Sequence, residues 1–181
     1  MTAPARYEPG RLEQVALDLF HGWGYAFYRD ANRLRADDLL VRAKAGDLLG
    51  QARAAVEAAE AEYRRVHLPP PSRARPRPDP EAVAAAKVLE RLGRDIGALV
   101  GRIAALPAPE GDRMSLWLRD EAATLAVLRD HDLRLVGRAE ALRALVAGRD
   151  GAALLAEAPL AEDLLAGLAE TLRARADALA G

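Results

Sequence analysis

The chain has 181 residues, 51% of them hydrophobic, and carries a formal net charge of −1 at pH 7. This length allows one domain with a full core, whereas the near-zero charge disfavours a partner attracted by charge alone, such as nucleic acid. The absence of cysteine excludes disulfides, thiol catalysis and cysteine-ligated metal centres, and the abundance of alanine and leucine favours helix over strand.

The first residues are predicted to form a loose arm followed by a short helix. Prolines at positions 4 and 9 disfavour helix across residues 1–9. From Gly10 onward, apolar residues recur with the spacing of one helical face: Leu12, Val15, Ala16, Leu19, Phe20 and Trp23. Gly22 and Gly24 end or bend this helix, and we expect it to cap one end of a helical bundle.

Aromatic residues gather at the end of this helix and directly after it. Five of the eight in the chain lie there: Phe20, Trp23, Tyr25, Phe27 and Tyr28. We expect them to form a hydrophobic plug that closes one end of the bundle. The alternative is an aromatic docking patch or a ligand pocket.

Residues 27–66 are predicted to form one long helix packed lengthwise against other helices. One set of positions recurs every seven residues: Phe27, Leu34, Val41, Leu48 and Ala55. A second set, offset by four, contains Ala31, Asp38, Ala45, Ala52, Ala59 and Val66. The arginine- and proline-rich segment 67–79 ends this helix and is predicted to be an exposed linker. It has no interleaved aromatic residues that would stack on bases, so we do not expect it to bind nucleic acid.

A third helix is predicted to begin at Asp79-Pro80-Glu81, with the aspartate as N-cap and the proline in the first turn. Its apolar stripe contains Ala85, Leu89, Leu92, Ile96, Leu99, Ile103 and Leu106. On a different face, Gly93, Gly97 and Gly101 are spaced by four. Because interior glycines destabilise a helix, we expect this row to receive a neighbouring backbone at close range, from this chain or from another copy.

The fourth helix is predicted to run from an N-cap at Asp112 to a stop at Gly148. Its inward positions are Met114, Leu118, Glu121, Leu125, Leu128, Asp132, Leu135, Ala139, Leu142 and Val146. A short helical piece over 152–158 then precedes the last helix, because Pro159 suits a first helical position. The apolar stripe of the last helix contains Leu160, Leu164, Leu168, Leu172 and Leu179.

Together these patterns predict an all-α fold in a single domain over residues 1–181. The expected architecture is an antiparallel bundle of four main helices. A short N-terminal helix and the short helical piece before the last helix complete it.

Three acidic residues interrupt the apolar stripes: Asp38, Glu121 and Asp132. Inward carboxylates that face one another across a bundle can build a di-metal centre, so these residues and His131 are candidate ligands for a divalent metal. The Glu-x-x-His pairs typical of such centres are absent. Arginines close to Asp38 and Asp132 along their own helices favour structural ion pairs instead.

No catalytic motif is present. Glycine-rich phosphate loops, a GxSxG turn and HExxH are missing, so we predict no catalytic residue and no cofactor. The leading hypothesis is a non-enzymatic helical-bundle protein that acts through protein–protein contacts, as an adaptor, assembly factor or scaffold. Its partner is another protein or a second copy of itself, as in a homodimer. The aromatic stretch and the glycine row are its candidate contact surfaces.

The alternative hypothesis is a bundle that binds a divalent metal or a small ligand through its inward carboxylates. Both hypotheses place the protein in the cytoplasm, because the sequence contains neither the apolar core of a signal peptide nor an apolar run long enough for a membrane span. Arginine outnumbers lysine 24 to 2, which indicates the coding bias of a GC-rich bacterium.

Overall fold

The computed structural model describes residues 9–22, 34–73, 76–106 and 121–180. These residues form five helices: α1 (Pro9–Gly22), α2 (Leu34–His67), α3 (Pro80–Ala104), α5 (Glu121–Val146) and α6 (Gly151–Ala180). No strand occurs in the described ranges, and the all-α prediction is confirmed. Within the same ranges, no helix is long and apolar enough to cross a membrane.

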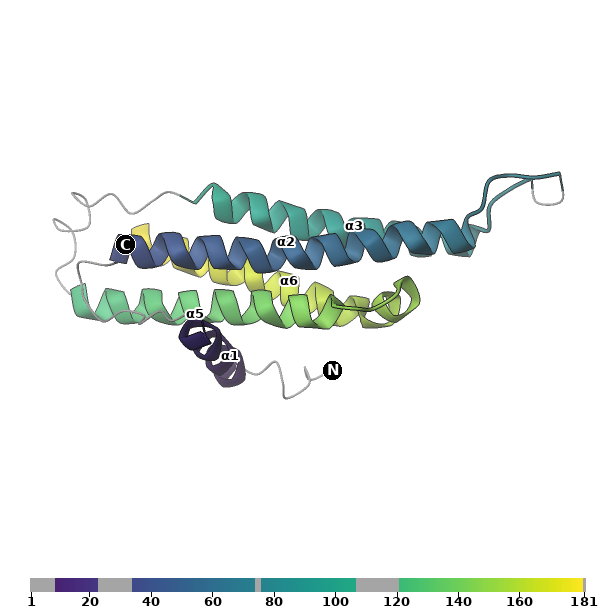
Figure 1. Cartoon of the computed structure of the whole chain (residues 1–181). Helices are drawn as coiled ribbons and strands as arrows, with labels where there is room; N and C mark the ends of the chain where they lie inside the picture. Colours follow the sequence, from purple (N-terminus) through teal and green to yellow (C-terminus); the bar gives the residue numbers. More distant parts are fainter. Residues whose placement is uncertain (1–8, 23–33, 74–75, 107–120, 181) are drawn as a thin grey trace.

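The four long helices pack as two helical hairpins lying side by side (Figure 1). In each hairpin, α2 with α3 and α5 with α6, the two helices are antiparallel. Between the hairpins, α2 contacts α5 and α3 contacts α6, and the members of each of these pairs run in the same direction (Figure 1). The helical bundle is therefore antiparallel within its hairpins and parallel between them.

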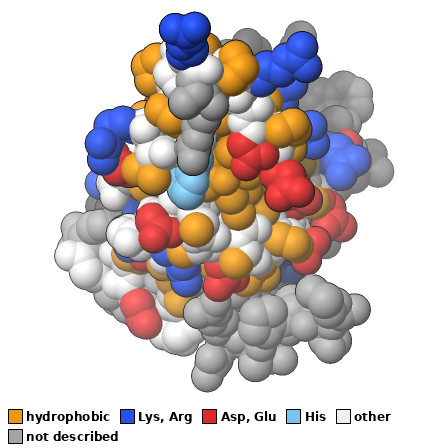
Figure 2. Space-filling view, turned by 90° about the vertical axis from the view of Figure 1, so that its right-hand side faces the viewer, with side chains coloured by type: hydrophobic (Ala, Val, Ile, Leu, Met, Phe, Trp, Pro, Cys, Tyr) orange, Lys and Arg blue, Asp and Glu red, His pale blue; other side chains and the backbone are white. Residues whose placement is uncertain are grey.

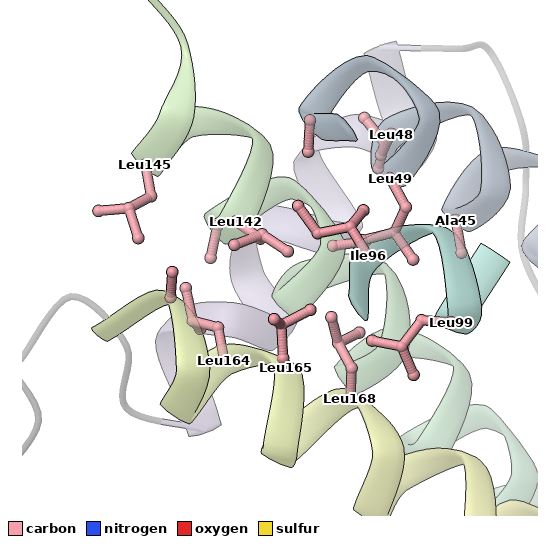
Figure 3. Close-up of a cluster of buried hydrophobic side chains, with 14 of the residues drawn as sticks. Ala45, Leu48, Leu49, Ile96, Leu99, Leu142, Leu145, Leu164, Leu165 and Leu168 are labelled. Carbon is pink, nitrogen blue, oxygen red and sulfur yellow. The ribbon is translucent and has the colours of Figure 1, made fainter. Parts of the chain in front are cut away.

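The core lies between these four helices. Figure 3 shows side chains from all of them converging, among them Leu49, Ile96, Leu142 and Leu168, each of which is fully buried. Burying one such side chain contributes about 1.5–3 kcal/mol to stability, so the shared core is what holds the hairpins together.

The buried face of α2 follows the predicted pattern in most positions. The buried members of the predicted stripe are Val41, Ala45, Leu48, Ala52 and Ala59. Ala55 is only partly buried while its neighbour Val56 is fully buried, and Val66 is 54% exposed. The cause is geometric, because an α-helix repeats every 3.6 residues and a seven-residue pattern drifts by about 20° per heptad on a straight helix. Residues 27–33 of the predicted helix lie outside the described residues.

Helix α3 begins where the sequence predicts. The Asp79 carboxylate accepts a hydrogen bond of 3.0 Å from the backbone N–H of Glu81, and Pro80 is the first helical residue. Most of the predicted stripe is buried: Leu89, Leu92, Ile96, Leu99 and Ile103. Past the other end of the helix, Arg42 of α2 donates a 2.5 Å hydrogen bond to the Leu106 carbonyl, which ties the end of α3 to α2.

Helix α6 is continuous, so the expected break before Pro159 is absent. The helix starts at Gly151, after the left-handed turn residue Gly148, and Pro159 lies in its interior. An interior proline costs about 3 kcal/mol. Burial on both sides of it offsets this cost, because Leu154 and Ala158 continue the buried stripe of Ala161 on the same helical face.

Helix α1 lies across the side of α5 and does not cap an end of the bundle, which corrects the prediction (Figure 1). Leu12 of α1 is buried there. A Cβ atom built on Gly137 of α5 would lie 2.1 Å from the Leu12 carbonyl oxygen, so this crossing requires glycine. Leu133 and Ala141, one turn to either side on the same face of α5, are buried as well.

We expect Gly137→Ala to lower the free energy of unfolding by about 1–3 kcal/mol, since its methyl group would collide with the α1 backbone. Gly46→Ala is the matched control. A Cβ at Gly46 meets no atom of the described residues within 4 Å, so alanine should stabilise α2 by about 0.4–1 kcal/mol. Urea titration in dilute solution, with circular dichroism as the readout of unfolding, measures both changes. Stabilisation at both positions would contradict the docking of α1 on α5.

The segment between α2 and α3 should be the first target of limited proteolysis. Arg73 is exposed and lies outside any helix, whereas the bonds after Arg75 and Arg77 precede prolines and resist trypsin. We therefore expect trypsin to cut first after Arg73, as read by mass spectrometry of the fragments. First cuts inside residues 80–104 would show that α3 is not docked.

Candidate contact surface on the α2–α3 hairpin

The aromatic stretch predicted as a contact surface lies almost entirely outside the described residues. Phe20 belongs to α1, but its side chain is not among those described, and Trp23, Tyr25, Phe27 and Tyr28 fall in the segment between α1 and α2. Its role as a plug or a docking patch stays a prediction.

The candidate metal ligands are not shown to come together. Asp132 is fully buried and its neighbour His131 is half-buried on α5. Asp38 and Glu121 belong to α2 and α5, with side chains outside the described set. Among the side chains that the structure describes, no three histidine, aspartate or glutamate residues lie close enough to hold a metal ion.

Asp132 forms a buried ion pair with an arginine of another helix. Its carboxylate accepts a 2.7 Å hydrogen bond from Nε of Arg175 on α6, and the two side chains are 0% and 3% exposed. The sequence predicted structural pairing with arginines of the aspartate's own helix, whereas Arg175 belongs to the neighbouring helix α6. A guanidinium at this distance neutralises the carboxylate and competes with any metal ion. The geometry is that of a link between α5 and α6.

A second polar contact lies in the same interface. Arg138 of α5 donates hydrogen bonds to the Thr171 hydroxyl and, at 2.5 Å, to the Gly167 carbonyl of α6. Burial lowers the pKa of Arg138, because desolvation disfavours its charged form. A Cβ at Gly167 would lie 3.0 Å from Nε of Arg138, so glycine makes room for this side chain. These directional bonds set the register of α6 on α5.

Among the described residues, side chains and not a helix backbone lie nearest to the glycine row of α3, and the approach of a backbone from another copy stays a prediction. The nearest atoms to a Cβ at Gly93 belong to the side chains of Glu57 and Val56, at 3.6 and 3.7 Å. At Gly97 they belong to the Arg53 guanidinium, whose nearest nitrogen is 3.1 Å away. A Cβ at Gly101 meets no atom of the described residues within 4 Å. Within the part of the chain that the structure describes, the row therefore faces side chains of α2 at Gly93 and Gly97 and no neighbour at Gly101.

A groove of about 420 Å³ lies over part of this row, between α2 and α3. Charged side chains from both helices line it: Arg53, Glu57, Glu60, Glu90 and Arg94. Leu89, Gly93 and Gly97 complete the lining. One pattern in the sequence could have indicated this groove. Arg53 and Glu57 are four residues apart, so they lie on one face of α2, and that face is opposite the glycine row of α3.

Ion pairs hold the acidic side chains of the groove in place. Arg53 pairs with Glu57 at 2.7 Å, and both side chains are about half exposed. Arg64 bridges the two helices, because it pairs with Glu60 on α2 and, at 2.9 Å, with Glu90 on α3. The hydrogen bond that Arg64 donates to the Glu60 carboxylate is the main cause of the raised pKa of Arg64. Exposed pairs of this kind contribute little to stability and leave their charges available to a partner.

The arginines at the end of α2, next to the 67–79 linker, do not make this end of the molecule uniformly positive. Arg65 pairs with Glu62 at 2.5 Å, and this hydrogen bond lowers the pKa of the Glu62 carboxyl. Seen from the linker end, the molecule carries acidic and basic side chains with apolar ones between them (Figure 2).

Comparisons with protein-family models, curated proteins and solved structures find no match for this chain.

The burial of the Asp132–Arg175 ion pair predicts a large contribution to stability, which can be tested. Asp132→Asn removes the negative charge that faces the buried Arg175 guanidinium at 2.7 Å, so we expect a loss of about 3–5 kcal/mol in the free energy of unfolding. Asp130→Asn is the control, because its pair with Arg134 is roughly 40% exposed and should be worth less than about 1 kcal/mol. Urea titration gives both values. Equal losses in the two variants would mean that the Asp132 pair is not buried.

Proposed function

We propose that this chain is a non-enzymatic helical-bundle protein that acts through protein–protein contacts, and that the α2–α3 groove is its contact surface. The groove is the observation that supports this proposal. It is open to solvent, it is lined by both helices of one hairpin, and it brings five charged side chains together. Charged side chains around a contact surface steer a partner and fix its register.

The lining of the groove fits a protein segment better than a small molecule. Small-molecule sites are mostly apolar and enclosed, with a few convergent polar groups. This groove has long charged side chains along its walls, and Leu89, its one large apolar lining residue, is fully buried. A helix or an extended segment laid along the groove would meet charges of both signs from α2 and α3.

The composition supports a bacterial and cytoplasmic setting for this function, because the chain is rich in arginine over lysine and has no cysteine. The buried carboxylate of Asp132 has an arginine partner, which is the arrangement of a structural residue. Stoichiometric metal in the purified protein, measured by mass spectrometry, would overturn this proposal in favour of a metal-binding bundle.

Site-specific photo-crosslinking in cells that contain the protein tests the contact surface. A photoreactive side chain replaces Arg94 in the groove or, as a control, the exposed Glu162 on α6. We expect a discrete covalent adduct from position 94 and none from position 162. The absence of any adduct from position 94 would contradict a contact at this groove.

A further inference from the structure

We propose that the partner of this chain presents an acidic helix, which binds along the outward face of α3 at the edge of the groove. This inference rests on the proposed function and names the chemistry of the partner. Four basic side chains on that face of α3 support it.

These basic side chains form a row along the helix. Positions 87, 91, 94, 98 and 102 are three or four residues apart, so they lie on one side of α3. Four of these positions are basic and the fifth is Ala98, and the basic row consists of Lys87, Arg91, Arg94 and Arg102. All five side chains are exposed. With a rise of roughly 1.5 Å per residue, the basic row is about 22 Å long.

The packing of α3 directs the basic row toward solvent. The apolar face of the helix lies on the opposite side and packs on α2 and α6. Its buried residues are Ala82, Ala86, Leu89, Leu92, Gly93, Ile96, Leu99 and Ile103. Because these residues fill the core, the orientation of the basic row is fixed by the fold.

The cations of the basic row have no ion pair with another described residue. By contrast, arginines elsewhere on the surface pair with carboxylates of their own helix, among them Arg53, Arg65 and Arg134. Four cations on one helical face without carboxylate partners produce a local positive potential, although the formal net charge of the chain is −1. Such a potential attracts and orients a partner of negative charge.

Acidic side chains limit the width of the basic row. Glu90 lies on its groove side, where it pairs with Arg64 at 2.9 Å, and Asp95 is exposed on its other side. A membrane surface or a nucleic-acid duplex carries negative charge across its whole surface and would meet both acidic residues. A helix can present a single row of carboxylates with uncharged side chains beside it. The narrow basic row therefore favours an acidic helix of a protein over a surface of phosphates.

Small residues allow a helix to lie close to the basic row. Ala98 lies within the row between Arg94 and Arg102, and Gly101 lies beside it. A Cβ built on Gly101 meets no atom of the described residues within 4 Å. The distance between two packed helices depends on the side chains at their contact, so this part of α3 permits a close approach.

A synthetic helix tests the binding directly. The probe is an alanine-based peptide of about 20 residues, long enough to span the basic row, with glutamates on one face at steps of three and four. Its isomer has the same composition and the same helix-stabilising staple, but its glutamates are distributed around the helix. Fluorescence anisotropy at low salt should show at least about tenfold tighter binding of the one-faced peptide. Added salt should weaken this binding, because it screens exposed charges.

Two double variants test which residues bind the peptide. Lys87→Glu with Arg91→Glu reverses half of the basic row and leaves the groove lining unchanged, so the one-faced peptide should bind at least about tenfold more weakly. Arg129→Glu with Arg173→Glu is the control, because it changes the net charge by the same amount at exposed positions of α5 and α6. The control should bind as the unaltered protein does. Circular dichroism should show both variants to be as helical as the unaltered protein.

Several outcomes would overturn the acidic helix as partner. They are equal binding of the two peptides, no binding at low salt, and equal losses in the two double variants. Tighter binding to a DNA duplex, or to vesicles of phosphatidylcholine and phosphatidylglycerol, would replace the acidic helix by a surface of phosphates.

The two proposals fail in different ways. With a photoreactive side chain at position 94, an unchanged yield of adduct in the Lys87→Glu, Arg91→Glu background would leave the contact at the groove intact and remove the acidic helix. The absence of adducts in the otherwise unaltered chain would remove both.

Discussion

The burial of α5 is the constraint on which the rest of the fold depends. Leu135, Ala139 and Leu142 are fully buried on one face of this helix, and Leu133, Gly137 and Ala141 are buried on the opposite face. A helix buried over so much of its circumference needs neighbours on several sides. Helices α2 and α6 cover two of them, and α1 covers the face around Gly137. The place of α1 on the side of the bundle follows from this need.

The polar residues of α5 make this packing specific. Apolar side chains alone tolerate sliding of one helix along another, whereas an ion pair or a hydrogen bond fits one register. Asp132 with Arg175, and Arg138 with the Gly167 carbonyl, supply two such contacts across the α5–α6 interface. The α2–α3 hairpin contributes its inner face to the same core, and the groove lies on its solvent-exposed side.

Features that depend on neighbours along the chain were predictable from the sequence. The periodicity of apolar residues predicted the long helices, and Asp79 with Pro80 predicted the start of α3 to the residue. Features that depend on contacts between helices were not predictable from the sequence. One stripe was assigned to each helix, so the second buried face of α5 and its glycine at 137 were missed. Arg175 was missed for a related reason, since its charge concealed its place on the buried stripe of Leu168 and Leu172.

The candidate site was predictable only in outline. The spacing of Gly93 and Gly97 indicated a surface for close contact, but spacing alone does not tell whether a neighbour presents backbone or side chains. The central claim is that the α2–α3 groove is a surface for protein contact. The chain has no cysteine, so single spin labels can be placed without background, at the exposed Ala98 beside the groove or at the exposed Ala166 on α6. In an extract of cells that contain the protein, the continuous-wave electron paramagnetic resonance spectrum of the label at 98 should broaden, because a bound partner restricts the label, whereas the spectrum of the label at 166 should not change. An unchanged spectrum at 98, or equal broadening at both positions, would contradict the account.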